Sequence, residues 1–204
     1  MNQVIAVRPL RVLALVDEAN LLGAARAFNK RLDWERIPAY LAAEQEGREL
    51  VEMVVYVGLP PAGMPEFQEQ REKKLRFIHW LRCHGHMVMT KDGSPRETEN
   101  GRRRFKANVD VLMAIDAMDL ATHIRPDVVV LVSGDGDFAH LAFTLRRRGI
   151  RVEVAAMDQT LSNELRQAAN GVIDLRQMLN QFDDLREDEM NRIGGDDVFD
   201  SIAL

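Results

Sequence analysis

The stretch that decides the fold is VVVLVSGDGDF, residues 128–138. Its first five residues are all apolar, and such a continuous run is typical of a strand that is buried on both faces of a parallel sheet. The run stops at a turn of small and acidic residues. After this turn, residues 138–148 have the pattern of a helix, closed by Gly149. A second apolar run, residues 11–16, also ends at an acid, Asp17.

Strand-like and helix-like segments alternate along the chain. Further strands are predicted at residues 50–57, 87–89, 151–156 and 171–175, and further helices at residues 21–28, 37–46, 66–83, 109–123 and 161–169. Residues 91–104 hold almost nothing apolar, so we interpret them as a long loop. The alternation predicts an α/β fold, with a mainly parallel sheet covered by helices on two faces.

Composition places the chain among globular proteins. Of its 204 residues, 46% are hydrophobic and 29% are charged. No apolar run approaches the ~20 residues that cross a bilayer, so we expect no membrane partner. Cys83 is the single cysteine. It excludes an intrachain disulfide and favours a reducing, cytoplasmic setting.

Charge is unevenly distributed along the chain. Residues 181–204 hold eight acids and two bases, a net charge of −6, whereas the whole chain carries −5. We therefore expect a domain over residues 1–180 and an acidic, flexible tail over residues 181–204, which could bind a protein partner. Basic residues gather at residues 71–76, 102–106 and 146–151. Local patches decide phosphate binding, so the acidic total does not exclude nucleic acid, although a solvated surface is the simpler interpretation of each cluster.

Acidic side chains follow the two most apolar strands. Asp17 ends the first, Asp135 and Asp137 follow the second, and Asp110 begins the helix that leads into it. Parallel sheets bind ligands at the carboxyl ends of their strands, so these four acids could converge. Crowded carboxylates repel unless a cation compensates, and hard oxygen ligands favour Mg²⁺ or Mn²⁺. Each acid alone could cap a helix or a turn, but the set at this place predicts a functional site.

Other motifs are weak. The sequence has no glycine-rich phosphate loop, which leaves little support for dinucleotide binding. Cys83, His84 and His86 resemble metal ligands, but partners with suitable spacing are missing. We therefore interpret them as surface or core residues, as we do His123 and His140.

Together these residues resemble the NYN domain of the PIN-like nuclease superfamily, and within it the bacterial LabA-like branch. The resemblance spans about residues 10 to 175. It rests on Asp17-x-x-Asn20, on Lys106 with Val109-Asp110-Val111, and most specifically on residues 133–138. It implies a Rossmann-like three-layer α/β/α domain of the PIN-like kind, an acidic cluster that binds Mg²⁺ or Mn²⁺, and RNA as the substrate.

Site roles follow from the resemblance, residue by residue. The acids that it assigns to metal binding and catalysis are Asp17, Asp110, Asp135 and Asp137. The residues that it places at the substrate are Asn20, which would orient Asp17 or touch a phosphate, and Ser133, Lys106, Arg102, Arg103 and Arg104. Asp116 matches a recurrent family acid, but six residues of helix turn it away from the face of Asp110, so we expect a structural role. Glu18 stands where many members have glycine, and it could add a ligand or crowd the substrate.

Two functions are open at this point. The first is a divalent-metal-dependent endoribonuclease that hydrolyses RNA phosphodiester bonds. The alternative is a non-catalytic regulatory module that binds RNA or a protein, in which the acidic tail competes for the basic patch. A phosphatase of the haloacid-dehalogenase type is disfavoured, because Ala19 stands where its second aspartate is needed. The apolar helix faces also permit a homodimer.

Overall fold

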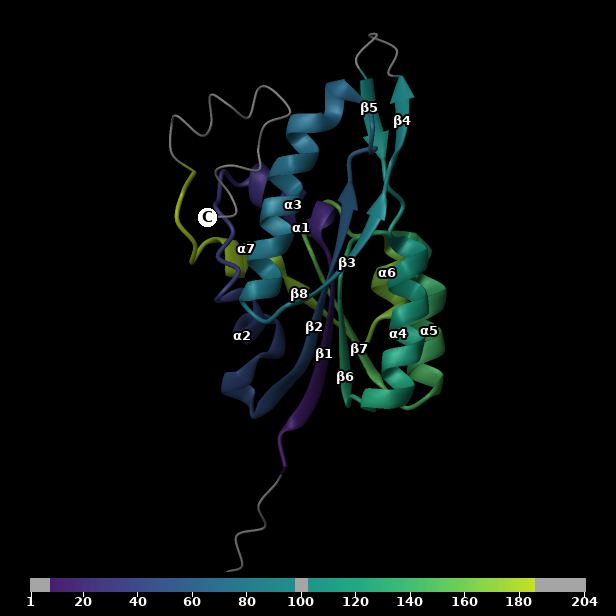
Figure 1. The fold of residues 1–204 in the computed structure, drawn as a ribbon. Helices are drawn as coiled ribbons and strands as arrows, with labels where there is room; N and C mark the ends of the chain where they lie inside the picture. The colour runs from purple at the N-terminus through teal and green to yellow at the C-terminus, as the bar shows by residue number, and fades with distance from the viewer. Residues whose placement is uncertain (1–7, 98–102, 186–204) are drawn as a thin grey trace, which may run out of the picture.

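The computed structural model describes residues 8–97 and 103–185, and its centre is a six-stranded sheet (Figure 1). The strand order is β3-β2-β1-β6-β7-β8, and every pairing in this sheet is parallel. The strands are β1 (Leu10–Asp17), β2 (Arg48–Leu59), β3 (Met87–Asp92), β6 (Val128–Val132), β7 (Arg151–Ala156) and β8 (Gly171–Asp174). The predicted parallel sheet is therefore confirmed.

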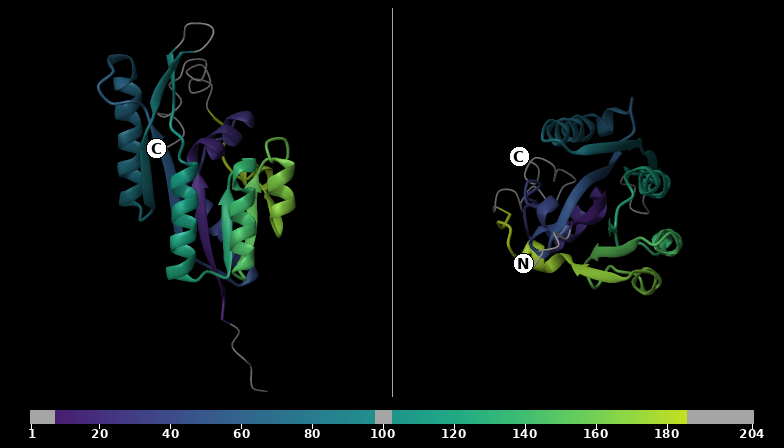
Figure 2. Two further views of the ribbon diagram at one scale, coloured as in Figure 1. Left: turned by 90° about the vertical axis from the view of Figure 1, so that its right-hand side faces the viewer. Right: turned by 90° about the horizontal axis from the view of Figure 1, so that it is seen from below.

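Helices cover both faces of the sheet (Figures 1 and 2). One face carries α1 (Glu18–Ala27), α2 (Ile37–Ala42), α3 (Gln68–Cys83) and α7 (Leu175–Leu179), and the other carries α4 (Asp110–Ile124), α5 (Ala139–Arg147) and α6 (Asn163–Ala168). Along β6, Val128, Val130 and Val132 enter one core, whereas Val129 and Leu131 enter the other. Both faces of the strand are buried, which explains its unbroken apolar run. The fold is a Rossmann-like three-layer α/β/α arrangement.

The segment that we interpreted as a loop is a β-ribbon over its described residues. β3 extends to Asp92, and the antiparallel strands β4 (Ser94–Glu97) and β5 (Arg103–Lys106) follow, while residues 98–102 lie outside the described part. The loop interpretation is wrong because a two-stranded ribbon exposed to solvent needs no apolar alternation. Phe105 anchors the ribbon on Phe67, with ring centroids 5.9 Å apart.

Two other elements differ from the expectation. The helix expected over residues 37–46 breaks at Ala43, whose φ of 54° is left-handed, and the short 3₁₀ helix η1 (Glu44–Glu46) follows. The helix α7 was not predicted, because five residues are too few to show a helical period. The predicted C-terminal glycine is confirmed: Gly149 follows α5 with a φ of 80°.

The start of the acidic tail packs on the domain. Phe182 and Leu185 are buried, and the backbone N–H of Leu185 donates to the carbonyl oxygen of Asn29 at 2.8 Å. Residues 186–204, which hold most of the tail's acids, lie outside the described residues. Within residues 8–97 and 103–185, no helix has both the length and the apolar character that a membrane span requires.

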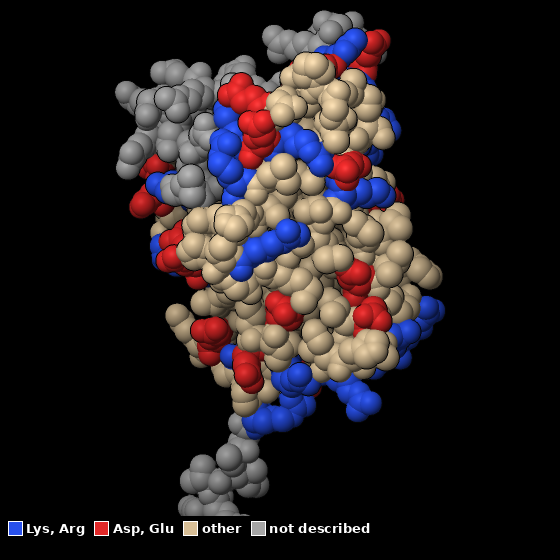
Figure 3. Space-filling model, in the orientation of Figure 1, with Lys and Arg blue, Asp and Glu red and all other residues tan. Residues whose placement is uncertain are grey.

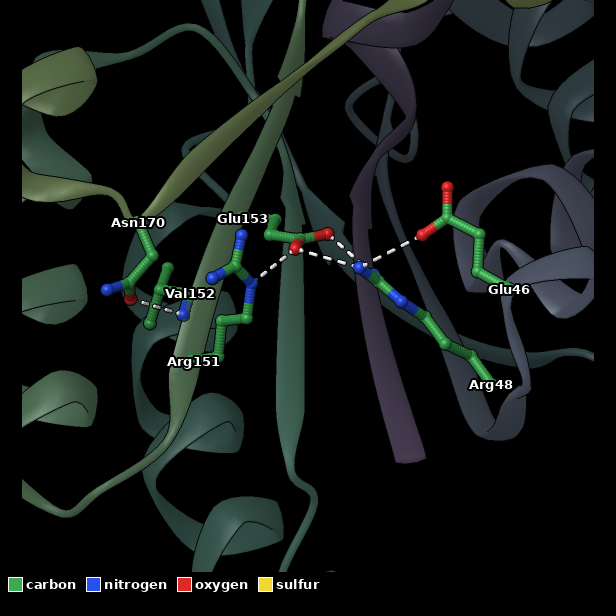
Figure 4. A network of polar contacts seen from close by, with 6 residues as sticks. All are labelled: Glu46, Arg48, Arg151, Val152, Glu153 and Asn170. Atoms are coloured by element: carbon green, nitrogen blue, oxygen red, sulfur yellow. Dashed lines mark hydrogen bonds and ion pairs between the residues drawn. The ribbon is translucent and has the colours of Figure 1, made fainter. Parts of the chain in front are cut away.

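A buried charge network joins the strands near their amino ends (Figure 4). Glu153 of β7 accepts hydrogen bonds from Arg48 of β2 at 2.8 and 3.2 Å, and from Arg151 at 2.6 Å. These contacts pass over β1 and β6, which separate the two strands in the sheet. The arginines hold the pKa of Glu153 below its usual range although burial acts to raise it.

Candidate functional site

The strand order reverses between β1 and β6. From β1 the chain moves outward to β2 and β3, then crosses to β6 and moves outward again to β8. Ligands of such sheets bind beyond the carboxyl ends of the strands at this reversal. Asp17 ends β1, and the turn that begins at Ser133 follows β6. The sequence-predicted acids therefore flank the place where an α/β sheet holds its site.

Asp17 ends β1 and also caps α1. Its Oδ1 accepts hydrogen bonds from the backbone N–H groups of Ala19 at 3.0 Å and Asn20 at 3.3 Å. Its Oδ2 accepts from the side-chain amide of Asn20 at 2.6 Å. Three donors thus fix a carboxylate that is almost completely buried. Orienting Asp17 is one of the two roles expected of Asn20.

The acidic turn after β6 is built in the same way. The Ser133 hydroxyl accepts from the backbone N–H of Asp135 at 3.2 Å, and Asp135 Oδ1 accepts from the N–H of Asp137 at 3.0 Å. Asp135 is thereby the N-cap of the short 3₁₀ helix η3 (Gly136–Phe138). Both aspartates are exposed, but Ser133 is only 1% exposed. Ser133 therefore shapes the turn from beneath and offers a substrate almost no surface.

Gly134 lets a second loop close on this turn. A Cβ at Gly134 would lie 2.3 Å from the carbonyl oxygen of Thr160. The N–H of Ser162 donates to the Gly134 carbonyl at 2.9 Å, and the Ser162 hydroxyl then caps α6. The loop after β7 thus supports the turn directly, and any side chain at position 134 would push the two apart.

Asp110 begins α4 and feels the charges of the other three acids. Burial raises the pKa of its carboxyl, and so do the negative charges of Asp17, Asp135 and, more weakly, Asp137. Lys106 acts in the opposite direction. The structure therefore brings these four acids and Lys106 to one edge of the sheet. The raised pKa of Asp110 reflects the negative charge of the neighbouring acids, which Lys106 offsets only in part.

The donor chemistry of this edge fits a hard divalent cation. In the part of the chain that the structure describes, no group of three or more His, Cys, Asp or Glu side chains is arranged to hold a metal ion. Mg²⁺ does not require such a cage, because it commonly binds through one or two carboxylates, several waters and substrate phosphate. The exposed carboxylates of Asp135 and Asp137, with the partly buried one of Asp110, suit that mode of binding.

Glu18 is buried and held against α3, although the charge of Asp17 also acts on its carboxyl. Its Oε2 accepts from Lys74 Nζ at 2.9 Å, and the two side chains are 0% and 6% exposed. Burial raises the pKa of Glu18, while the Lys74 ammonium lowers it. The contact with Lys74 directs the Glu18 carboxylate toward α3, whereas the sequence suggests an added metal ligand or a crowded substrate.

Sequence reasoning missed Lys74, although the sequence carries a signal for it. Lys74 precedes Phe77, Ile78 and Leu81 by three, four and seven residues, and those three residues form the buried face of α3. A lysine at that spacing is placed in the core and needs a partner. The signal does not name the partner, because Glu18 lies 56 residues away in the chain.

Asp116 lies six residues after Asp110 on α4 and is not among the acids that shift the pKa of Asp110. It approaches Tyr56, which is fully buried on β2. Burial, followed by the charge of Asp116, raises the pKa of Tyr56. The tyrosine hydroxyl has no hydrogen bond of normal geometry within the described residues. This placement agrees with the structural role expected of Asp116.

The basic residues expected at the substrate lie on the ribbon that leads into α4. Arg103 and Arg104 are on β5, Lys106 ends it, and Arg102 lies outside the described residues. Arg103 forms an ion pair with Glu66, whereas Arg104 and Lys106 are exposed. The ribbon therefore carries positive charge to within four residues of Asp110.

Of the histidines near Cys83, His79 contacts the cysteine, whereas His84 and His86 have other surroundings. Cys83 Sγ lies 3.6 Å from Nε2 of His79, one helical turn earlier. His84 instead stacks on Trp80, with ring centroids 3.9 Å apart, and contacts its carbonyl oxygen. His86 is partly buried, and burial lowers its pKa.

Comparison with known proteins places the chain in a family. The NYN domain matches residues 11–178. The low amplitude and bright protein LabA of Synechococcus elongatus is 34% identical over 172 residues, which covers 83% of this chain and 86% of that protein. A solved structure of a protein of unknown function from Vibrio parahaemolyticus is 24% identical, with a TM-score of 0.59 over 82% of this chain and 94% of that one, a likeness of fold. The resemblance drawn from the sequence is confirmed, and the chain belongs to the NYN domain family, which is related to the PIN-like nucleases.

Proposed function

We propose that this protein is a divalent-metal-dependent endoribonuclease that hydrolyses RNA phosphodiester bonds. The observation that carries the proposal is the placement of Asp17, Asp110, Asp135 and Asp137 at the carboxyl edge of the sheet, where the charges of the other three acids act on Asp110. The strand order of the parallel sheet reverses at this edge. Four carboxylates that are close together there repel one another, and this repulsion lowers stability unless a cation binds between them. Membership of a family related to nucleases supports the choice of phosphodiester chemistry.

The four acids would hold Mg²⁺ or Mn²⁺, which activates water and stabilises a leaving oxygen when bound. The other residues act on the acids or on the RNA. Asn20 fixes the Asp17 carboxylate, and Ser133 holds the turn of Asp135. Lys106 offsets part of the acidic charge and would bind a backbone phosphate beside it.

The ribbon would grip the RNA strand. Arg104 and Lys106 are exposed on β5, which runs directly toward Asp110. Arg103 keeps part of its guanidinium on Glu66, so it braces the ribbon against the start of α3 while its remaining donors face solvent. Arg102, also expected at the substrate, lies outside the described residues. A basic strip beside an acidic edge separates phosphate binding from metal binding.

The test is cleavage of labelled RNA, single-stranded and structured, by wild-type protein and by Asp110→Asn, with Mg²⁺, Mn²⁺ or EDTA. Asp110 is the best position because, unlike Asp17 and Asp135, it makes no capping hydrogen bond. Asp116→Asn is the matched control, since it makes the same change six residues along α4. We expect metal-dependent cleavage that is lost in Asp110→Asn and kept in Asp116→Asn. Equal metal-dependent cleavage by both variants would refute the assigned site.

The alternative is a regulatory module that binds RNA or a protein without cleaving RNA. The observation that favours it is that no three carboxylates among the described residues are arranged around one ion. The same experiment separates the two functions when binding of the labelled RNA is also measured across a salt series. Salt-sensitive RNA binding without cleavage under any metal would establish the binding module and reject the nuclease.

A further inference from the structure

Arginines gather at the opposite edge of the sheet from the four acids. Two adjoining hollows of about 470 and 740 Å³ lie there, at the ends of α4 and α5 and the amino ends of β6 and β7, and they share residues 149–151. The arginines that line them, which we call the arginine surface, are Arg125, Arg146, Arg147, Arg148 and Arg151. Lys and Arg side chains are conspicuous at this lower end of the molecule in Figure 3.

The arginine surface keeps a net positive charge. The one acid that lines the hollows is Asp127, which already accepts two hydrogen bonds of 2.8 Å from the Arg8 guanidinium and one from the N–H of Arg11. The C-terminal ends of α4 and α5 contribute roughly half a negative charge each. Glu153 also accepts a hydrogen bond of 2.6 Å from Arg151. Asp127, Glu153 and the two helix ends together offset about three of the five positive charges, so the surface stays positive by about two. Stabilising two helix ends therefore does not account for five arginines.

The guanidinium groups also keep free donors. Arg148 donates to the Thr122 hydroxyl and Arg147 to the Thr144 hydroxyl, each at 3.1 Å. The Arg125 side chain makes no hydrogen bond or ion pair within residues 8–97 and 103–185. Each guanidinium has five N–H donors in a planar fork that matches a phosphate group. Most donors of these three side chains thus face solvent in a concave surface.

We propose that the arginine surface binds the phosphate backbone of RNA, as a second contact remote from the acidic edge. A concave surface with excess arginine charge suits a polyanion, because phosphate contacts supply sequence-independent affinity. Only the choice of RNA as the polyanion rests on the proposed function. The contact would hold a long RNA on the protein while the acidic edge works on another part of it.

The two edges are too far apart for a short RNA to reach both. Asp127 and Asp135 stand eight residues apart along β6 and its turn, roughly 25 Å at about 3.3 Å per residue. At about 3.4 Å per stacked nucleotide this corresponds to roughly seven nucleotides. An oligonucleotide of four can occupy one edge only, whereas one of thirty can occupy both.

The test compares the double variant Arg125→Gln/Arg147→Gln with Arg36→Gln/Arg82→Gln, which removes the same charge outside the two hollows. Binding of four- and thirty-nucleotide RNAs is followed by fluorescence anisotropy in EDTA across a salt series. Single strands lose about 0.7 in the log–log salt slope per phosphate contact, so two lost contacts lower the slope for the long RNA by about 1.4. Taking 1 M salt as the reference, affinity at 0.1 M falls about 25-fold in the arginine-surface variant. With metal, the four-nucleotide RNA should be cleaved as by wild-type protein, because the acidic edge is unchanged.

Three results would overturn the inference. They are equal salt slopes in the two double variants, slower cleavage of the four-nucleotide RNA by the arginine-surface variant than by wild-type protein, and no binding of the long RNA by the wild-type protein. Failure of the nuclease proposal looks different. In that case neither RNA is cleaved by the wild-type protein with any metal, while the loss of long-RNA binding in the arginine-surface variant is still measurable.

Discussion

The buried pair of Glu18 and Lys74 yields the sharpest stability prediction. Glu18→Ala leaves the Lys74 ammonium in the core, where the two side chains are 0% and 6% exposed, without the carboxylate that it binds at 2.9 Å. Removing one partner of such a pair costs about 3–5 kcal/mol. For a chain of this size each kcal/mol lowers Tm by about 2–4 °C, so Tm should fall by roughly 6–20 °C.

The assay is thermal unfolding followed by circular dichroism, with two comparison variants. Glu35→Ala removes an exposed glutamate and should change the free energy of unfolding by no more than about 0.5 kcal/mol. Glu18→Met/Lys74→Met removes both charges and retains volume. It should return Tm to near the wild-type value, because an apolar replacement of a buried pair is often neutral or stabilising. The folded fraction of Glu18→Ala should keep any RNA cleavage, since the side chain faces α3.

The reasoning fails on either of two outcomes. A Tm for Glu18→Ala within about 2 °C of wild type would mean that the pair is not buried as the structure has it. A double variant that loses as much stability as the single variant would mean that packing at these positions, and not the loss of the carboxylate beside Lys74, sets the cost.

Three further predictions follow from other contacts. Asp110→Asn should raise the stability of the metal-free protein, because it removes a charge that burial and nearby acids disfavour. Mn²⁺ at a concentration of 100 times its Kd should stabilise the wild-type protein by about 2.7 kcal/mol and the variant by less. Equal shifts of Tm in the two proteins would contradict this. Gly134→Ala should lower the free energy of unfolding, measured by urea denaturation, by about 1–3 kcal/mol, because the new Cβ would lie 2.3 Å from the Thr160 carbonyl oxygen. An unchanged free energy of unfolding would show that the loop after β7 moves to accommodate the methyl group at little cost. Glu153→Gln should lower the free energy of unfolding by about 3 kcal/mol at pH 7, because it breaks the ion pair with Arg48. The folded pKa of Glu153 is lowered, so the stability from this pair is present above pH 4.5 and is lost as pH falls through the folded pKa. A stability difference between variant and wild type that does not change with pH would count against this.

The sheet and its acidic edge could be predicted because their signals are local. The apolar runs of β1 and β6 are each continuous. Asp17 comes directly after the first run, and Asp135 comes three residues after the end of the second. The parallel topology then brings the strand ends together. Asp110 could be placed there too, because it opens the helix that feeds β6.

The parts that could not be predicted depend on distant partners or on solvent. The ribbon of β4 and β5 is exposed, so no apolar period marks it. The direction of the Glu18 side chain is set by Lys74, which no local pattern connects to it. The closure of Thr160 on Gly134 depends on how the loop after β7 returns to the neighbouring strand, a contact that only the folded sheet defines.

The double duty of Asp17 and Asp135 has an evolutionary consequence. Each accepts backbone hydrogen bonds that start a helical turn, so a descendant that had lost all chemistry would still be selected to keep both acids for folding. Their presence in a relative therefore says little about whether that relative is active. The Asp110 side chain is not a helix cap, and its negative charge is unfavourable at this place unless a cation binds there. Among relatives that have lost the activity, the aspartate at position 110 should therefore be replaced earlier than those at positions 17 and 135.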